Sequence, residues 1–284
     1  MNNAASIRAR LNNISRKENI AFQVIIVRYL HERLLYRLSI SEHADRFCLK
    51  GGNFIYALQG LSTRPTMDID LLAKSIRFEV DTLMKAFRDI AGIACDDGAW
   101  FNTENIRIEP IAAQNIYSGI RLSIPAGFDT IKQNLQIDIG FGDLITPEAI
   151  KLQYPVLLDD LPAPVLSAYT PETVIAEKFH AMIFLSGANS RMKDFYDVHH
   201  LLSSGNYILE NLEKAIRVTF MQRKTFFVES HELFTEGFAT DNQRNRIWQA
   251  FLKKINQPAS LTFPEVLLEV THVLKPIWET IPKE

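Results

Sequence analysis

The segment Thr66–Leu72, read TMDIDLL, constrains the fold more than any other part of this 284-residue chain. Pro65 prevents regular structure from continuing into the segment from the N-terminal side, and polar and apolar residues then alternate along it. Successive side chains of a β-strand point to opposite faces of its sheet, so alternation predicts a strand with one buried face. Asp68 and Asp70 therefore project together from the other face.

Two carboxylates on one strand face repel each other unless a cation lies between them. At about 4 Å, two like unit charges cost on the order of 4 kcal/mol at an effective dielectric constant near 20. Mg²⁺ removes this cost, and it accepts an incomplete set of protein oxygens when phosphates supply the remaining ligands. We therefore expect Asp68 and Asp70 to bind Mg²⁺, although an exposed polar strand face is the alternative for this pair alone.

A second alternating segment, Leu135–Ile139, carries Asp138 in its polar phase. If the two strands are neighbours, Asp138 becomes a third metal ligand, and three carboxylates are able to hold two metal ions for phosphate chemistry. Asp143, four residues after the segment in a Gly-Phe-Gly-Asp run, is interpreted as a turn residue.

Two glycines, Gly51 and Gly52, precede a short helix-like run that ends at Gly60. Glycines at the start of a helix allow backbone N–H groups to approach a phosphate closely, and the helix N-terminus adds partial positive charge there. Lys50 and Arg64 flank this run, and their charges are able to neutralise a bound triphosphate. A plain turn is the ordinary explanation of a glycine pair that stands alone.

The rest of the chain predicts sheet first and helix afterwards. Apolar residues at three-and-four spacing predict a long amphipathic helix over residues 15–39, with Ser15 as its N-cap. Further strands are predicted at 106–111, 119–124, 135–139 and 165–169, and helices at 53–59, 80–91, 171–185, 190–203, 207–222, 241–256 and 264–280. Thr170-Pro171-Glu172 predicts a helix start with proline in the first position.

The fold class is therefore α+β, with a mixed-sheet domain followed by a mainly helical one. The predicted domains are residues 1–165, including the N-terminal helix, and residues 166–284.

The composition is that of an ordinary globular protein, with 47% hydrophobic and 23% charged residues. The first 46 residues hold eight Arg or Lys against four Asp or Glu, which is either a solvated helix face or a surface for nucleic acid or a partner. Cys48 and Cys95 lack the spacing of a zinc site. No apolar run has the length of a signal peptide core or a membrane span, so we expect a cytoplasmic protein without a membrane partner.

The order of these motifs, Lys-Gly-Gly at 50–52, Arg-x-Thr at 64–66 and Asp-Ile-Asp-Leu at 68–71, resembles the first motif of nucleotidyltransferases. In this variant it is similar to the AbiEii/AbiGii toxin family, whose relatives include the MenT toxins. Thr66 of the Arg-x-Thr pair joins the expected nucleotide-binding residues. The resemblance spans roughly residues 50–198, and the rest of the chain matches only in its helical character.

The resemblance implies two further motifs, a lysine in a helix and then a Lys/Arg-Asp-x-x-Asp segment. Lys178 supplies the first, and Asp194 with Asp197 supplies the second. The family pattern implies that Lys178 steadies the triphosphate, and that Asp194 orders this lysine or activates the acceptor hydroxyl. Alternatively, Lys178 is a solvated helix residue. One aspartate then caps its helix or pairs with Arg191 or Lys193.

The resemblance also implies a function: a Mg²⁺-dependent enzyme that moves a nucleoside monophosphate from an NTP to an acceptor hydroxyl and releases pyrophosphate. The acceptor would be RNA, in particular tRNA, and the helical domain would complete the active site. The enzyme would be the toxin of a bacterial toxin–antitoxin pair in phage defence, with an antitoxin encoded nearby and no stable complex required. The competing hypotheses are a nucleotidyltransferase that acts on a small molecule or a protein, and a catalytically silent NTP-binding regulator.

Overall fold

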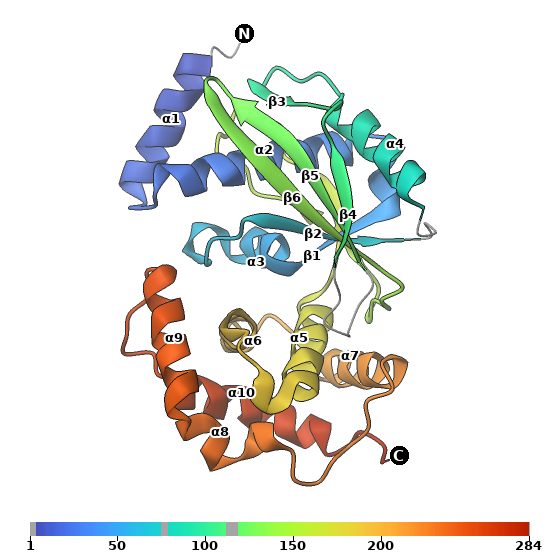
Figure 1. The fold of residues 1–284 in the computed structure, drawn as a ribbon, viewed down its shortest axis with the longest axis vertical. Coiled ribbons are helices and arrows are strands. Elements are labelled where there is room, and N and C mark those ends of the chain that lie inside the picture. The colour runs from blue at the N-terminus through green and yellow to red at the C-terminus, as the bar shows by residue number, and fades with distance from the viewer. Residues whose placement is uncertain (1–3, 75–78, 112–118, 284) are drawn as a thin grey trace. The chain divides into compact units, whose positions relative to one another are not determined.

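The computed structural model describes residues 4–74, 79–111 and 119–283, and it divides into two compact units. The first unit comprises residues 1–143 and 150–168, and the second comprises 144–149 and 169–284. The described chain combines one mixed sheet with many helices (Figure 1), so the α+β fold class is confirmed. No described helix is both long and apolar enough to cross a membrane.

The first unit is built on an eight-stranded sheet in the order β3-β5-β6-β2-β1-β8-β7, with β4 also paired to β5. Strand β2 is central, since it pairs antiparallel with β1 and parallel with β6. The strands are β1 (Phe47–Lys50), β2 (Asp68–Ala73), β3 (Ala99–Phe101), β4 (Arg107–Ile111), β5 (Gly119–Phe128), β6 (Ile131–Phe141), β7 (Ile150–Gln153) and β8 (Val165–Ala168). The sequence did not indicate the short strands β1, β3 and β7.

One face of this sheet is covered by two helices, α2 (Phe22–Ser39) and α4 (Val80–Ala91). Their apolar side chains meet Ile69 and Leu71 of β2 and Ile137 of β6 around a small gap in the core. Each buried aliphatic side chain of this kind stabilises the fold by roughly 1.5–3 kcal/mol. The other face of β2 and β6 is therefore available for polar side chains.

The N-terminal helix differs from the sequence prediction. Two helices, α1 (Ala4–Lys17) and α2, replace the single helix expected over residues 15–39. Ser15 is not an N-cap: it lies in the last turn of α1, and its hydroxyl donates to the Ile20 carbonyl at 2.6 Å. Asn19 between the helices has a left-handed φ of 51°, which turns the chain there.

The excess of basic residues in the N-terminal segment is not a surface charge throughout. Arg28, Arg33 and Arg37 of α2 are at most 3% exposed. Arg37 donates to both carboxylate oxygens of Asp97, at 2.7 and 3.1 Å, and Arg33 pairs with Glu32 at 2.6 Å. These arginines hold loops against α2, so neither of the two sequence interpretations applies to them.

The second unit is helical. It contains α5 (Pro171–Leu185), α6 (Met192–Ser203), α7 (Leu209–Gln222), α8 (Glu236–Thr240), α9 (Asn242–Lys254) and α10 (Phe263–Trp278). Helix α5 packs against α6 and α7, and α6 packs against α10 (Figure 1). The predicted start of α5 is confirmed, since Thr170 caps it by accepting from the Thr173 N–H and Pro171 is its first residue.

Replacing Arg37 with methionine is expected to lower the free energy of unfolding by about 3–5 kcal/mol, because it leaves the buried Asp97 carboxylate without its ion-pair partner. Arg8→Met is the matched control, because Arg8 pairs with Asp129 on the surface, where such pairs contribute about 1 kcal/mol or less. Urea unfolding followed by circular dichroism measures both. Equal losses in the two variants would contradict the structural role of Arg37.

Candidate active site

Three carboxylates gather on the polar face of the central strands. Asp68 and Asp70 of β2 and Asp138 of β6 offer oxygens that all lie within 4.8 Å of one another. The strand register explains the cluster, because Asp70 is directly opposite Asp138 on the parallel neighbour. All three side chains are partly exposed, so a ligand from solution has access to them.

The chemistry of this cluster fits a hard divalent cation. Carboxylate oxygens are the ligands that Mg²⁺ and Mn²⁺ prefer, and a partial protein set leaves positions for phosphate oxygens or water. The strands fix the separation of the three groups, so their mutual repulsion is not relieved by simple rotation apart. The donor set thus fits the group that the sequence predicts.

Helix α3 (Gly51–Gln59) begins where β1 ends, directly beside this cluster. Gly51 has a φ of 63°, and a Cβ built on it would lie 1.9 Å from Oδ2 of Asp70. A Cβ on Gly52 would lie 2.7 Å from the hydroxyl oxygen of Thr66. Both positions therefore require glycine for close approach, and the first N–H groups of α3 start next to the carboxylates.

The loop before β2 is tied to the same place by hydrogen bonds. The Thr66 hydroxyl donates to Oδ1 of Asp68 at 2.8 Å, and the Asn53 amide of α3 donates to the Asp68 carbonyl at 2.7 Å. The Tyr154 hydroxyl in turn donates to Oδ1 of Asn53 at 2.7 Å. Asn53 is 1% exposed, so this chain of bonds fixes Asp68 from the protein side.

Lys50 and Arg64, which the sequence predicts to contact phosphate, contact other groups of the protein in this structure. The Lys50 ammonium lies 3.0 Å from Oδ2 of Asp143, so Asp143 is more than a turn residue, in contrast to its sequence interpretation. Arg64 is a partly exposed residue of the loop before β2, and its Nη1 lies 3.4 Å from the Pro65 carbonyl. Lys50 remains within reach of the cluster, since it is opposite Asp70 in the register.

The sequence reasoning missed Arg121. It lies opposite Asp138 on the antiparallel neighbour β5 and donates to both carboxylate oxygens, each at 2.7 Å. Its place in the polar phase of Gly119–Ile124, between the buried Ile120 and Leu122, was the signal that could have found it.

In the second unit, Lys178 of α5 lies between two carboxylates of α6. Its ammonium is 2.6 Å from Oδ1 of Asp194 and 2.9 Å from Oδ2 of Asp197, and Nε of Arg191 is 2.8 Å from Oδ2 of Asp194. Asp194 and Asp197 are 0% and 2% exposed, and the Lys178 side chain is 12% exposed. Lys178 is therefore not a solvated surface residue, and the neutral cluster joins α5 to α6.

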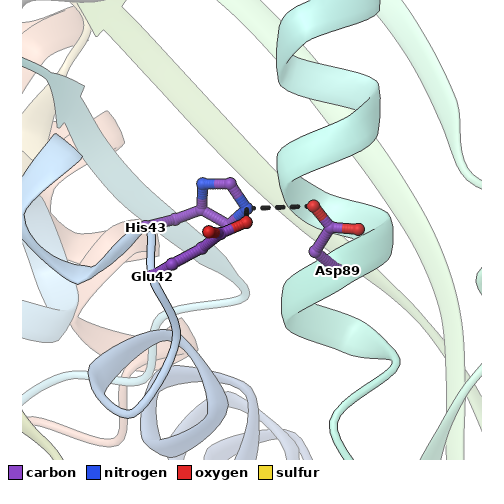
Figure 2. Close-up of side chains that lie close together, drawn as sticks. All are labelled: Glu42, His43 and Asp89. Carbon is purple, nitrogen blue, oxygen red and sulfur yellow. Dashed lines mark hydrogen bonds and ion pairs between the residues drawn. The ribbon is translucent and has the colours of Figure 1, made fainter.

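A different acidic group in the first unit surrounds His43 (Figure 2). Nε2 of His43 lies 3.1 Å from Oδ2 of Asp89 and 3.6 Å from Oε1 of Glu42. These residues lie before β1 and on α4, at the end of β1 away from Lys50. Both carboxylates are well exposed, at 77% for Glu42 and 41% for Asp89, whereas the His43 side chain is only 5% exposed. A hydrogen bond between His43 and Asp89 that ties the two segments accounts for this group.

Comparison with known proteins identifies the class. The sequence profile of the family described as nucleotidyl transferase AbiEii toxin, Type IV toxin–antitoxin system, matches residues 33–269, so the chain belongs to this family. Comparison with curated protein sequences gives no significant match.

Two crystal structures have the same fold. One is of JHP933 from Helicobacter pylori, with a TM-score of 0.52 and 15% identity over 90% of this chain and 92% of that one. The other is of a candidate nucleotidyltransferase from H. pylori, with a TM-score of 0.50 and 16% identity over 89% and 93% of the two chains. The protein is thus a nucleotidyltransferase of a toxin–antitoxin system, and this class implies an NTP substrate and an antitoxin.

Gly51→Ala is expected to abolish nucleotidyl transfer, because the new Cβ displaces Asp70. Gly205→Ala is the matched control, since Gly205 has a similar φ of 68° and nothing within 4 Å of a built Cβ. Each variant loses about 1–2 kcal/mol of stability from the left-handed backbone. Only the first should lose transfer and binding of Mn²⁺, as measured by labelled-NTP assay and by titration. Normal transfer by folded Gly51→Ala would contradict this account of the site.

Proposed function

We propose that this enzyme uses Mg²⁺ to transfer a nucleoside monophosphate from an NTP to a hydroxyl group of RNA, with tRNA as the first acceptor to examine. The observation that carries the proposal is the cluster of Asp68, Asp70 and Asp138 within 4.8 Å beside the N-terminus of α3. A carboxylate cluster and a helix N-terminus together suit a metal-bound triphosphate, since the carboxylates bind the metal cation and the helix N-terminus binds the phosphate anion.

In the proposed reaction the acceptor oxygen forms a bond to the α-phosphorus, the bond from this phosphorus to the β-phosphate oxygen breaks, and pyrophosphate leaves as the hydroxyl proton passes to solvent. Bound Mg²⁺ would supply positive charge to the phosphates and lower the pKa of the attacking hydroxyl. Asp68 and Asp70 are assigned as its ligands. The backbone N–H groups of Gly51 and Gly52 are assigned to phosphate oxygens.

Lys50, Arg64 and Thr66 border the same glycine turn and are proposed to contact the nucleotide. For Lys50, a phosphate would compete with the Asp143 carboxylate that it meets at 3.0 Å. For Thr66, the hydroxyl that bonds to Asp68 would help to hold this ligand in place.

Lys178 is proposed to steady negative charge during transfer, and Asp194 to order this lysine. The complete burial of Asp194, and its contacts with both Lys178 and Arg191, favour ordering over direct activation of an acceptor hydroxyl. The alternative is that these ion pairs only stabilise the packing of α5 against α6 and take no part in transfer.

The biological proposal is that transfer to RNA makes the protein toxic to its own cell, as a defence against phage, and that the antitoxin counteracts it. Membership of a Type IV toxin–antitoxin family supports this proposal.

Incubation with each labelled NTP, Mg²⁺ and total cellular RNA tests the function. We expect label in the tRNA fraction with one or more NTPs, and a loss of at least about 10³-fold for Asp68→Asn, since losing a metal ligand removes several kcal/mol of transition-state stabilisation. Asp81→Asn, an exposed acid on α4, is the control and should keep full activity. Expression of the wild type should slow growth, and Asp68→Asn should relieve this.

The same assay separates the competing proposals. Label on a small molecule or on protein would replace RNA as the acceptor, and NTP binding without any labelled product would indicate a silent regulator. Lys178→Met should lose transfer at a temperature where it is folded, whereas Lys214→Met, an exposed lysine of α7, should not. Full activity of folded Lys178→Met would leave the lysine with only its structural role.

A further inference from the structure

Arg28 of α2 is a buried cation without a carboxylate partner. The residue is 3% exposed, and none of the described acidic side chains forms an ion pair with it. Glu32, one turn further along α2, pairs with Arg33 at 2.6 Å instead. Arg37 differs in this respect, because it has the Asp97 carboxylate. Taking a charge out of water without an anion beside it costs free energy, so other contacts have to account for an arginine at this position.

The contacts of Arg28 lead to two segments that flank the glycine turn. Its Nη2 donates to the Thr63 carbonyl at 3.1 Å, and its guanidinium carbon lies 4.6 Å from the centre of the Tyr56 ring of α3. Burial raises the pKa of Tyr56 to about 12, so this ring is neutral and offers its π face to the guanidinium. Nη1 of Arg28 has no hydrogen-bond partner among the described residues. Arg28 thus joins α2 both to α3 and to the loop before β2.

The stretch from Thr63 to the carboxylate cluster is short and stiff. The Thr63 N–H and hydroxyl both donate to the Gly60 carbonyl, at 3.3 and 3.0 Å, so Thr63 closes a turn at the end of α3. Three residues later, the Thr66 hydroxyl donates to Oδ1 of Asp68 at 2.8 Å. Pro65 lies between them, and a proline has a fixed φ and restricts the residue before it. A shift of Thr63 would therefore move Thr66 as well.

We propose that Arg28 is a positioning residue for nucleotide binding. By contacting the Thr63 carbonyl and the Tyr56 ring together, it sets where the loop that carries Arg64 and Thr66 lies relative to the glycine turn. Arginine suits this role because its planar group stacks on an aromatic ring while its edge donates to a carbonyl. The inference rests on the proposed function, in which Arg64 and Thr66 contact the nucleotide.

Calorimetric titration with each NTP in the presence of Mg²⁺ tests this inference through binding alone. We expect Arg28→Met to weaken the affinity for the preferred NTP by about tenfold or more, since partners that orient binding groups from outside a site typically contribute this much. In the transfer assay the KM for this NTP should rise while kcat stays close to the wild-type value, which is the signature of lost binding. Arg28→Lys keeps the charge and a donor for the Thr63 carbonyl, so its affinity should lie between those of the wild type and Arg28→Met.

Arg37→Met is the matched control, because Arg37 is a buried arginine of the same helix whose contacts hold the Asp97 loop. It should lower the urea midpoint of unfolding more than Arg28→Met does, since it leaves a buried carboxylate unpaired, whereas Arg28→Met leaves no anion behind. Its NTP affinity should equal that of the wild type. The opposite order of the two effects separates a positioning role from a general structural one.

Wild-type affinity in folded Arg28→Met, or an equal loss of affinity in Arg37→Met, would overturn the role of Arg28. Circular dichroism establishes folding. If Arg28→Met does not fold, wild-type affinity in Arg28→Lys would overturn the proposal, and if neither variant folds, Arg28 is a structural residue and the proposal fails.

The binding measurements also separate a failure of this inference from a failure of the proposed function. NTP binding without any labelled product would contradict the proposed reaction, and the affinities of the variants would still decide the role of Arg28. A wild type that binds no NTP would overturn both.

Discussion

Electrostatic repulsion among Asp68, Asp70 and Asp138 is the constraint on which the rest of the site depends. The strand register holds these carboxylates within 4.8 Å of one another, and their backbones cannot separate without breaking the centre of the sheet. At this spacing each like-charged pair costs a few kcal/mol, a large part of the stability of an ordinary domain. Cations must therefore be nearby, either as side chains of the protein or as ligands from solution.

The features around the cluster follow from that requirement. Lys50 is opposite Asp70 and Arg121 is opposite Asp138 in the strand register, so both bring positive charge to the cluster. The N-terminus of α3 adds the partial positive charge of its first N–H groups. Gly51 is needed because any side chain there would occupy the space of the Asp70 carboxylate. On the opposite face, Ile69 and Ile137 pack the same two strands against α2 and α4. This buried packing fixes the backbone of both strands, and with it the positions of the aspartates on the other face.

The sequence predicted those parts of the molecule that depend on local pattern. Alternation placed Asp68 and Asp70 on one face, and Thr170-Pro171 located the start of α5. The sequence could not predict contacts between distant segments, because no local signal pairs Arg121 with Asp138 or Lys50 with Asp143. The N-terminal prediction failed for a different reason. A serine followed by an acid three residues later also occurs in a last helical turn, and here the Ser15 hydroxyl bonds to a carbonyl instead of capping an N–H.

A crystal structure of the protein with Mn²⁺ and a non-hydrolysable NTP measures the central claim most directly, because Mn²⁺ is located by its anomalous scattering. The account predicts an anomalous peak at about 2.1–2.2 Å from carboxylate oxygens of both Asp68 and Asp70, with the triphosphate at the N-terminus of α3. A nucleotide bound away from Gly51, or a metal ion that leaves both aspartates uncoordinated, would contradict it.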